Sequence, residues 1–459
     1  MMRSFTAAEV AHLTRGRLLC GNSDTLIDNI QYDSRQAGKG SLFVPIKGEK
    51  VDAHRFIEAC FGQGAAATLT EQKPPQNAKE PYILVDNTKA ALQRLAAAYR
   101  QEMKVRLIGV TGSVGKTSTK EMIAAALSKG LTVMKTKGNR NSQIGLPLTM
   151  FDIEPQHDAA VIEMGMSEFG EMDRLCDIAR PEMAVMTNIG KAHIENLHSQ
   201  ENILKEKFRI TKHFTKDSTL FLNGDDPLLK TLKGKQPFHT VTFGMSPEND
   251  YYADDIIVSG FSTEFTVHYH NHAFRLQIPA LGQHNITNAL AAFAVGIACG
   301  LSEQTIAQGL LTYQNAPMRQ QIYRCSDFVL IDDSYNASPE ATKASLDVLK
   351  SIAKGKTIAV LADMLELGEA AASEHEGVGS HLAAIGIDQL IAVGELSRFT
   401  AKGAEQNGCP LVLTADSNNE AYQLLKAAIC SGCTILIKGS RGMHTDEIVK
   451  KLLADQSVT

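Results

Sequence analysis

Short apolar runs alternate with longer helical stretches through the middle of the chain. The runs are RLIGV, AAVIEMG, MAVMTNIG and STLFLNG, which begin at Arg106, Ala159, Met183 and Ser218. A run that is apolar without alternation predicts a strand buried on both faces, as in a parallel sheet covered by helices. The middle of the chain is therefore expected to form a parallel α/β unit.

A second series of the same kind lies between Phe328 and Ser440. Its runs are FVLIDD, TIAVLAD, QLIAVGE, PLVLTAD and TILIKGS, again with helical segments between them. Two consecutive α/β units follow from this pattern, with a join near residues 312–318.

The region before the first series is shorter and more mixed. The segment EQKPPQNAKEP, from Glu71 to Pro81, is polar and proline-rich and indicates a surface loop. A short strand, YILVDN, and a helix over residues 88–100 are expected after it. The sequence thus predicts an α/β protein of three domains: a small α+β module over residues 1–85, a central parallel sheet over 86–314, and a Rossmann-like α/β domain over 315–459.

Composition and charge narrow the class of protein. The 459 residues are 44% hydrophobic and 21% charged, and the formal net charge of −5 argues against a nucleic-acid-binding protein. The N-terminus lacks the apolar stretch of a secretory signal. The most apolar run, Ala289 to Leu301, is shorter than the roughly 20 residues that cross a bilayer, so a buried helix is expected. We expect a cytoplasmic protein without a membrane segment.

The cysteines and the surface pattern add little. The eight cysteines are scattered, and the single CxxC pair, Cys430 and Cys433, has no second pair beside it. Structural or chance spacing is the expectation for this pair, and a reduced protein fits best. No interface signature is evident, so a monomer is the default.

The stretch GVTGSVGKTSTKEM, from Gly109 to Met122, is the most informative local signal. A strand, a glycine-rich turn and a helix follow one another, which is the setting of a nucleotide phosphate loop. Backbone N–H groups and the helix N-terminus would face phosphate oxygens. Val110 stands where the usual pattern has glycine, and a helix capped by a glycine-rich turn is the alternative. The expected ATP-binding residues are Gly112, Ser113, Val114, Gly115, Lys116, Thr117 and Ser118.

Six further motifs occur in a fixed order with this loop. They are IEMGMSEFGEMDRL, TNIGKAHIENLHS, LGQHNITNALAA, DDSYNASPEA, LADMLELGE and KGSRGM. Together with TGSVGKTS they resemble the Mur ligase family, the ATP-dependent, amide-forming enzymes of peptidoglycan precursor synthesis. The resemblance covers essentially the whole chain. Its last three motifs are most similar to the members that add D-Ala-D-Ala to a UDP-N-acetylmuramoyl-tripeptide.

The resemblance implies a metal site with Mg²⁺, two ions in all, held by Thr117, Glu163, His193 and Lys207. Glu163 ends a predicted strand, where ligands of open α/β sheets bind, although a satisfied loop carboxylate is the alternative. A lone histidine such as His193 is more often structural. Lys207, in KEKFRI, matches the family's lysine that reacts with CO₂ to form a carbamate, whereas a solvated helix lysine is the alternative. Lys116, Lys207 and His193 are the catalytic candidates.

The same resemblance assigns the rest of the nucleotide site. Asn285 and Asn288 correspond to the pair that contacts adenine, and they would also suit the start of a helix. Arg319 would bind ATP phosphate and Asp333 the ribose hydroxyls, once the third domain closes over the nucleotide. Tyr335, Asn336 and Ser338 would face the incoming dipeptide.

The N-terminal module resembles the family's uridine-nucleotide segment. Its expected UDP-substrate-binding residues are Ser34, Arg35, Phe43, Lys47 and Gly48. The chain departs from the family pattern at Ala53, Ser142 and Ala362, where Gly, Asn and Gly are usual. These departures leave open whether substrate contacts differ there.

The activity implied is ligation of D-Ala-D-Ala to the UDP-linked tripeptide through an acyl phosphate made with ATP. A sister ligase that adds the third, diamino acid residue usually carries DNPR, which this sequence lacks. A folate polyglutamyl ligase would lack the uridine-type module. A non-catalytic nucleotide-binding protein would have no reason to keep Glu163, His193 and the Lys207 segment together. Whether the tripeptide ends in lysine or diaminopimelate is not encoded in these motifs.

Overall fold

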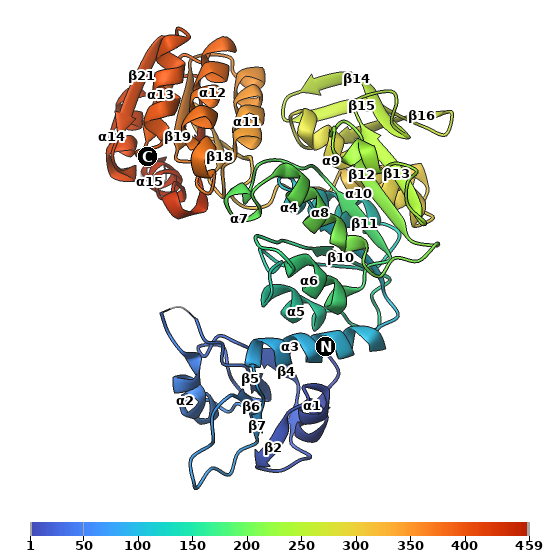
Figure 1. Ribbon diagram of the computed structural model, residues 1–459. Coiled ribbons are helices and arrows are strands. Elements are labelled where there is room, and N and C mark those ends of the chain that lie inside the picture. Colours follow the sequence, from blue (N-terminus) through green and yellow to red (C-terminus); the bar gives the residue numbers. More distant parts are fainter. Residues whose placement is uncertain (1, 49, 457–459) are drawn as a thin grey trace.

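The computed structural model describes residues 2–48 and 50–456, and its three larger sheets follow one another along the chain (Figure 1). The mixed α/β class expected from the apolar runs is confirmed. The predicted domain limits at residues 85 and 314 stay a prediction, although each larger sheet lies within one of the three ranges.

The N-terminal part holds a five-stranded sheet beside a two-stranded ribbon. In the larger sheet β7 pairs antiparallel with β2, and the remaining neighbours are parallel. The sheet order is β2 (Arg17–Cys20), β7 (Tyr82–Leu84), β6 (Ala67–Thr70), β5 (Ser41–Phe43) and β4 (Asn29–Gln31), and the ribbon pairs β1 (Phe5–Thr6) with β3 (Leu26–Ile27). The helices are α1 (Ala7–Leu13) and α2 (Ile57–Gly62). Residues 71–81 form the expected loop, without helix or strand.

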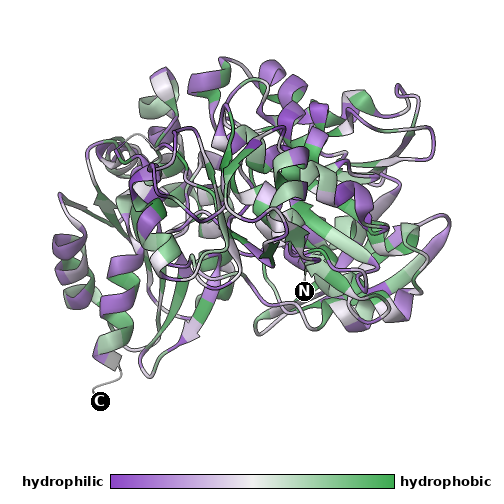
Figure 2. Cartoon of the chain, turned by 90° about the horizontal axis from the view of Figure 1, so that it is seen from below, coloured by the Kyte–Doolittle hydropathy of each residue, from purple (hydrophilic) through white to green (hydrophobic). Residues whose placement is uncertain are grey.

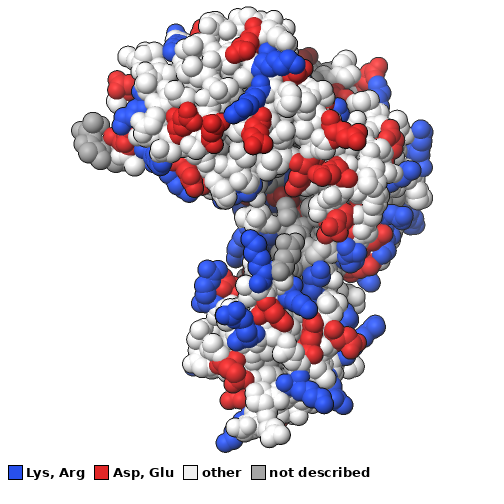
Figure 3. Space-filling model, turned by 60° about the vertical axis from the view of Figure 1, so that its left-hand side comes forward, with Lys and Arg blue, Asp and Glu red and all other residues white. Residues whose placement is uncertain are grey.

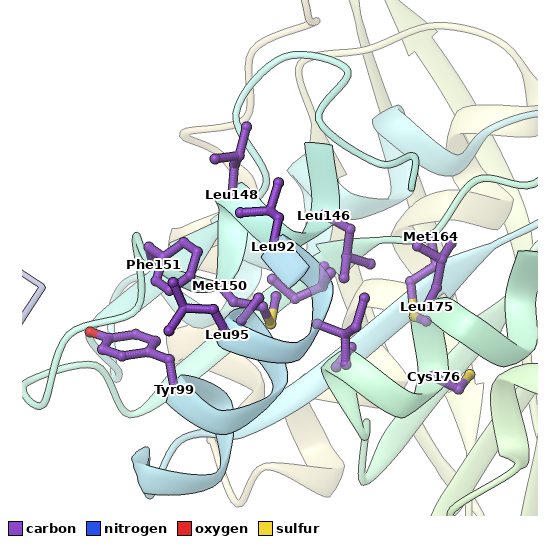
Figure 4. Close-up of a cluster of buried hydrophobic side chains, with 14 of the residues drawn as sticks. Leu92, Leu95, Tyr99, Leu146, Leu148, Met150, Phe151, Met164, Leu175 and Cys176 are labelled. Carbon is purple, nitrogen blue, oxygen red and sulfur yellow. The ribbon is translucent and has the colours of Figure 1, made fainter. Parts of the chain in front are cut away.

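Helix α3 (Thr88–Glu102) joins this part to the central one. Figure 4 shows Leu92, Leu95 and Tyr99 on α3 near Phe151, within one buried cluster that spans both parts. Tyr99 also donates a hydrogen bond to the Ile153 carbonyl at 2.6 Å. The shared apolar core ties the N-terminal module to the central sheet through one helix.

The central sheet has nine strands. Seven neighbouring strands are parallel: β9 (Val133–Lys135), β10 (Ala159–Glu163), β8 (Arg106–Thr111), β11 (Met183–Met186), β12 (Thr219–Asn223), β13 (His239–Gly244) and β14 (Tyr251–Ser259). Beyond β14 the sheet continues with β15 (Ser262–Tyr269) and β16 (His272–Ile278), each antiparallel to the strand before it. The four predicted strands are confirmed, whereas β9, β13, β14 and the antiparallel extension were not predicted.

Helices cover this sheet, and apolar residues concentrate on its strands (Figure 2). The helices are α4 (Lys116–Leu127), α5 (Gly145–Met150), α6 (Glu171–Ala179), α7 (Ile194–Leu197), α8 (Gln200–Phe208), α9 (Gln283–Ala298) and α10 (Glu303–Leu310). The apolar run from Ala289 lies in α9 and is buried, as predicted. Within residues 2–48 and 50–456, no helix has the length and apolar character needed to cross a membrane.

Strand β8 lies between β10 and β11, and their carboxyl ends are level. Glu163 is opposite Val110, and Met186 is opposite Thr111. After β8 the chain first adds strands on the β10 side of β8 and later adds strands on the β11 side. The direction in which strands are added therefore reverses at β8. Ligands of open α/β sheets bind at such a point.

The C-terminal part is a six-stranded sheet covered by helices. Its order is β17 (Gln321–Arg324), β18 (Phe328–Asp333), β22 (Cys433–Lys438), β19 (Thr357–Ala362), β20 (Gln389–Val393) and β21 (Leu411–Ala415), and only β17 is antiparallel. The helices are α11 (Pro339–Ile352), α12 (Ala371–Ala384), α13 (Ser397–Gln406), α14 (Asn418–Ala428) and α15 (Asp446–Gln456). All five predicted strands are confirmed. Residues 312–318, where the join is expected, lie in the loop between α10 and β17, and the join itself stays a prediction.

Short 3-10 turns complete the structure. They are η1 (Ala53–Phe56), η2 (Arg209–Thr211), η3 (Leu229–Leu232), η4 (Gly368–Ala370) and η5 (Arg441–Met443).

Candidate active site

The phosphate loop connects β8 to α4, as the sequence predicted. Residues that follow β11 hold its shape: Asn188 Oδ1 accepts from the Val114 N–H at 2.8 Å, and Thr187 Oγ1 donates to the Val114 carbonyl at 2.5 Å. A Cβ at Gly112 would lie 1.9 Å from Thr187 Oγ1, so only glycine fits there. Sequence reasoning missed Thr187 and Asn188 as loop supports, although both lie within the predicted strand run MAVMTNIG and directly follow the observed β11.

Two lysines, the half-buried Lys116 and the buried Lys207, converge on one carbonyl of this loop. Lys116 Nζ donates to the Gly112 carbonyl at 2.7 Å, and Lys207 Nζ donates to the same oxygen at 3.1 Å. Burial lowers the pKa of Lys116 despite the opposing effect of Glu163. Burial, followed by the charge of Lys116, holds the pKa of Lys207 well below its usual range. The loop is therefore built for an anion, and Lys207 has a chemically unusual amine.

Glu163 lies at the end of β10, beside the start of α4. Thr117 Oγ1 donates to its Oε2 at 3.0 Å, Asn141 Nδ2 donates to its Oε1 at 2.7 Å, and Lys120 Nζ lies 3.8 Å from Oε2. The carboxylate is buried, with 2% of the residue exposed. A hydroxyl and a carboxylate in contact are a donor set that suits a hard divalent cation. The sequence predicted Thr117 and Glu163 but missed Asn141 and Lys120.

His193 turns toward the C-terminal domain. Its Nδ1 lies 2.8 Å from Glu366 Oε2, and Lys191 pairs with Glu374 on the same side of the cleft. His193 and Glu366 both have positive φ angles, of 63° and 64°. In the described chain, no group of three or more His, Cys, Asp and Glu side chains is arranged to hold a metal ion. The structure thus brings Thr117 and Glu163 together and gives His193 a different partner.

The predicted adenine and ribose residues lie on facing elements. Asn285 and Asn288 are buried near the start of α9, where Asn288 Oδ1 accepts from Thr119 Oγ1 at 2.9 Å. Asp333 ends β18 and pairs with Lys438, and Ser345 Oγ donates to it at 2.6 Å. Sequence reasoning did not assign Lys438, although it lies in the KGSRGM motif.

Arg319 and Tyr335 are packed together, with the guanidinium carbon 4.2 Å from the ring centroid. Ser338 caps α11, and its side chain accepts from the Ala341 N–H. The Asn336 carbonyl accepts from Lys438 Nζ at 3.0 Å.

A cavity of about 1040 Å³ separates the central and C-terminal domains. It contains most of the predicted nucleotide and dipeptide residues: Ser113, Val114, Gly115, Lys116, Thr117, Ser118, His193, Asn285, Asn288, Arg319, Asp333, Tyr335, Asn336 and Ser338. Gly112, Glu163 and Lys207 are not part of its lining. Residues from three distant stretches of sequence thus face one space large enough for a nucleotide and a small second substrate.

The predicted uridine residues lie away from this cavity, in the N-terminal module. Arg35 is exposed and pairs with Asp33 at 2.6 Å, which lowers the pKa of that carboxyl to about 2. Lys47 and Gly48 are exposed, and Ser34 is half-buried. On the face seen in Figure 3, Lys and Arg side chains gather where the N-terminal module meets the rest of the molecule.

Phe43 departs from its expected role. The residue is completely buried in a cluster with Ala37, Ile57 and Tyr82, because β5 is an interior strand of the sheet. Its ring can support a binding surface from below but does not form one in this structure.

A phosphate loop that faces a second α/β domain across a cleft is the arrangement of a nucleotide-dependent enzyme. Three family models match the sequence in order: the Mur ligase family catalytic domain over residues 26–100, the Mur ligase middle domain over 110–296, and the glutamate ligase domain over 318–441. The chain belongs to the Mur ligase family.

Individual relatives indicate which kind of Mur ligase the chain resembles. The chain is 39% identical over 455 residues to the UDP-N-acetylmuramoyl-tripeptide–D-alanyl-D-alanine ligase of Bacillus subtilis, with 98% of each chain covered. It is similar to the crystal structure of MurF from Acinetobacter baumannii, with a TM-score of 0.91, 29% identity and 99% of each chain covered. MurF from Thermotoga maritima, solved in complex with ADP, gives a TM-score of 0.84 at 27% identity, covering 94% of this chain and 98% of that one. The predicted family is confirmed.

Proposed function

We propose that this protein uses ATP to join D-alanyl-D-alanine to a UDP-N-acetylmuramoyl-tripeptide, making the pentapeptide precursor of peptidoglycan. The observation that carries the proposal is the cleft itself: Lys116 and Thr117 of the phosphate loop face Arg319 and Asp333 of the C-terminal domain. The Bacillus subtilis relative, aligned over 98% of both chains, carries this activity in its name.

Each domain has one task in this proposal. Residues 1–85 hold the UDP end of the substrate, with Ser34 and Arg35 at the diphosphate and Lys47 and Gly48 beside the uracil. Residues 86–314 hold ATP. Residues 315–459 bring the dipeptide and close over the nucleotide. Binding energy at the distant UDP end helps to position the reacting carboxylate.

The chemistry begins with an activation step. A carboxylate is a poor acyl donor, and transfer of the γ-phosphoryl group from ATP makes it an acyl phosphate. The amine of D-Ala-D-Ala then attacks the acyl carbon, the new C–N bond forms, and phosphate leaves. Lys116 faces the terminal phosphates and offsets the repulsion between two approaching anions.

Thr117 and Glu163 are the residues that would hold a first Mg²⁺. Their contact at 3.0 Å preforms the donor pair, and Asn141 keeps the carboxylate in place. When bound, the ion would neutralise charge on the phosphates during transfer. A second ion would use Glu163 and the carbamate of Lys207, with His193 joining only after it leaves Glu366.

Carbamate formation at Lys207 is the finer part of the proposal. Only an uncharged amine attacks CO₂, and burial together with Lys116 favours the uncharged form of Lys207. Its nitrogen forms a bond to carbon and loses one proton, so a neutral amine becomes an anionic carbamate. That anion would form an attractive pair with the Lys116 ammonium beside the Gly112 carbonyl.

Tyr335, Asn336 and Ser338 are proposed to face the dipeptide. They lie at the cavity edge between β18 and the N-terminus of α11, a position that favours an anionic group. Arg319 stacks on Tyr335, which keeps the guanidinium directed along the cleft toward the phosphates.

The test is release of phosphate from ATP in the presence of both tripeptide substrates, ending in lysine or in diaminopimelate. D-Ala-D-Ala should support release and yield a product heavier by that dipeptide, while free diamino acids should not. Release only with a UDP-dipeptide and a diamino acid would assign the sister activity. No release with any pair would contradict the ligase proposal.

A further inference from the structure

A series of hydrogen bonds links side-chain amides beside the cavity, and the donors and acceptors all follow in one direction. We call this series the amide chain. Thr119 Oγ1 donates to Asn288 Oδ1 at 2.9 Å, and Asn288 Nδ2 donates to Asn285 Oδ1 at 3.3 Å. Asn285 Nδ2 then donates to Gln320 Oε1 at 3.0 Å. Each amide oxygen accepts from the residue before it, so none of these amides can rotate by half a turn without losing a bond.

The far end of this chain is a buried histidine. Gln320 Nε2 lies 3.3 Å from His284 Nε2, which accepts when the neutral imidazole carries its proton on Nδ1. Burial lowers the pKa of His284, against the opposing influence of Asp333, and so favours the neutral ring. In that tautomer His284 accepts from Gln320 Nε2, which leaves Gln320 Oε1 directed to Asn285.

Gln320 occupies a special place between the two domains. It is buried and has a φ angle of 52°, in the left-handed region. Its backbone N–H donates to Asp333 Oδ1 at 3.1 Å, and its carbonyl accepts from Asn315 Nδ2 at 2.9 Å. One residue therefore contacts both the asparagine pair of α9 and the aspartate proposed to bind ribose.

The bonds within the chain leave a defined polar edge. Asn285 uses both of its amide hydrogens, one on Gln320 and the other on the Leu281 carbonyl at 2.8 Å. Its Oδ1 keeps a second lone pair, and Asn288 Nδ2 keeps a second hydrogen. The pair thus offers one acceptor beside one donor, and both residues line the cavity.

That edge matches adenine and not guanine. Adenine presents an amino donor beside the N7 acceptor, whereas guanine presents two acceptors, O6 and N7, at the same positions. A flipped Asn285 would present two donors and favour guanine. The identity of the accepted base therefore depends on what prevents Asn285 from flipping. Two acceptors hold its Nδ2 in place, the Leu281 carbonyl at 2.8 Å and Gln320 Oε1 at 3.0 Å, and of these only Gln320 is a side chain.

We infer that Gln320 is a positioning residue that selects adenine by holding the amide of Asn285 in one orientation. This inference rests on the proposed function, because it assigns the base of the nucleotide to the Asn285–Asn288 pair. Gln320 acts through Asn285, and its link to Asp333 makes base selection depend on the placement of the C-terminal domain.

The test measures nucleotide binding to the full chain by titration calorimetry, without any ligase turnover. ATP, GTP and the triphosphate of unsubstituted purine ribonucleoside are compared on wild type and on Gln320→Met. Methionine has a similar length, faces the same φ constraint and makes no amide hydrogen bond. Gln321→Met is the matched control, because Gln321 is the next residue in the sequence and its side chain takes no part in the amide chain.

Wild type should prefer ATP over both other nucleotides. Gln320→Met should reduce the ATP-to-GTP affinity ratio roughly tenfold, within the range of one bidentate base contact. When the 6-amino group of the base is removed, Gln320→Met should lose less affinity for the nucleotide than wild type loses. Thr119→Val, which removes the donor at the other end of the chain, should shift the ratio in the same direction, whereas Gln321→Met should not.

An unchanged ATP-to-GTP ratio in Gln320→Met, with the thermal midpoint near that of wild type, would overturn the inference. Equal loss of affinity for all three nucleotides would also overturn it, since that result indicates a general structural role. If Gln320→Met does not fold, Thr119→Val decides alone by the same ratio. A wild-type protein that selects ATP but ligates nothing would contradict the proposed function and leave this inference standing.

Discussion

The burial of Lys207 is explained by the chemical role proposed for it and not by a contribution to folding stability. Its side chain lies at the phosphate loop with 1% exposure of the residue, and its ammonium would meet that of Lys116 at one carbonyl oxygen. Burying a charge beside a like charge destabilises a fold unless the group is neutral or becomes an anion. Such a site lowers the folding stability and is retained for its proposed function.

Lys207→Ala should lower kcat by about 100-fold or more, the upper range for loss of a group that supports a metal site. Part of the activity should return when a short carboxylate such as acetate is added, because it replaces the lost anion. Lys205→Ala is the control, since that lysine is exposed two residues earlier on the same helix. Normal turnover in Lys207→Ala, or no CO₂ adduct in intact-protein mass spectra, would contradict the carbamate.

The same residue predicts a pH-dependent stability. Burial lowers the pKa of Lys207 in the folded protein, so the unfolded chain binds more protons from that folded pKa up to about 10.4. Stability contributed by this site therefore rises with pH across that window. In CO₂-free buffer near pH 7, Lys207→Met should melt higher than wild type, and the gap should narrow toward pH 10. A gap that widens with pH would show the opposite sign.

At the scale of elements, strand order brings the site together. The carboxyl ends of β10, β8 and β11 are level, which places Glu163, the phosphate loop and Asn188 side by side. The loop conformation is thus fixed by a neighbouring strand as much as by its own glycines.

Gly112→Ala tests that dependence. The added Cβ would meet Thr187 Oγ1 at 1.9 Å, so either the loop moves or the Thr187 side chain turns away and loses its bond to the Val114 carbonyl. We expect ATP affinity to fall at least tenfold, a loss of about 1.4 kcal/mol, as measured by titration calorimetry. Gly62→Ala in α2, where a Cβ meets nothing within 4 Å, should leave ATP affinity unchanged. Equal affinity in both variants would show that the loop tolerates a Cβ.

At the scale of the whole molecule, the C-terminal domain meets the central domain through charged contacts as well as through the amide chain. Lys191 pairs with Glu374, and His193 lies beside Glu366. Contacts of this kind between partly exposed groups contribute modestly, so the proposed closure of the C-terminal domain would make or break them at little cost.

Glu374→Ala should therefore open the cleft slightly. We expect a larger radius of gyration in small-angle scattering and a rise in the KM for ATP of less than about fivefold, which corresponds to under ~1 kcal/mol for an exposed pair. The exchanged pair Lys191→Glu with Glu374→Lys should restore both values. Glu376→Ala, which removes a pair with Lys402 inside the C-terminal domain, is the control. An unchanged radius of gyration in Glu374→Ala would show that the Lys191–Glu374 pair does not hold the cleft closed.

The sequence by itself determined most of the buried parallel strands and the phosphate loop between β8 and α4. Buried parallel strands have no polar alternation, and the glycine turn before Lys116 and Thr117 is read from adjacent positions, so both signals are local. The antiparallel β14 to β16 escaped because much of β14 is exposed and gives no continuous apolar run.

Tertiary structure alone decided which distant side chains meet. Lys207 reaches the Gly112 carbonyl across 95 positions of sequence, and Asn285 reaches Gln320 across 35. Phe43 shows the same limit, because its burial depends on β5 lying between β4 and β6. Strand order and helix packing set these contacts through the burial of whole faces, and no local pattern of residues contains that information.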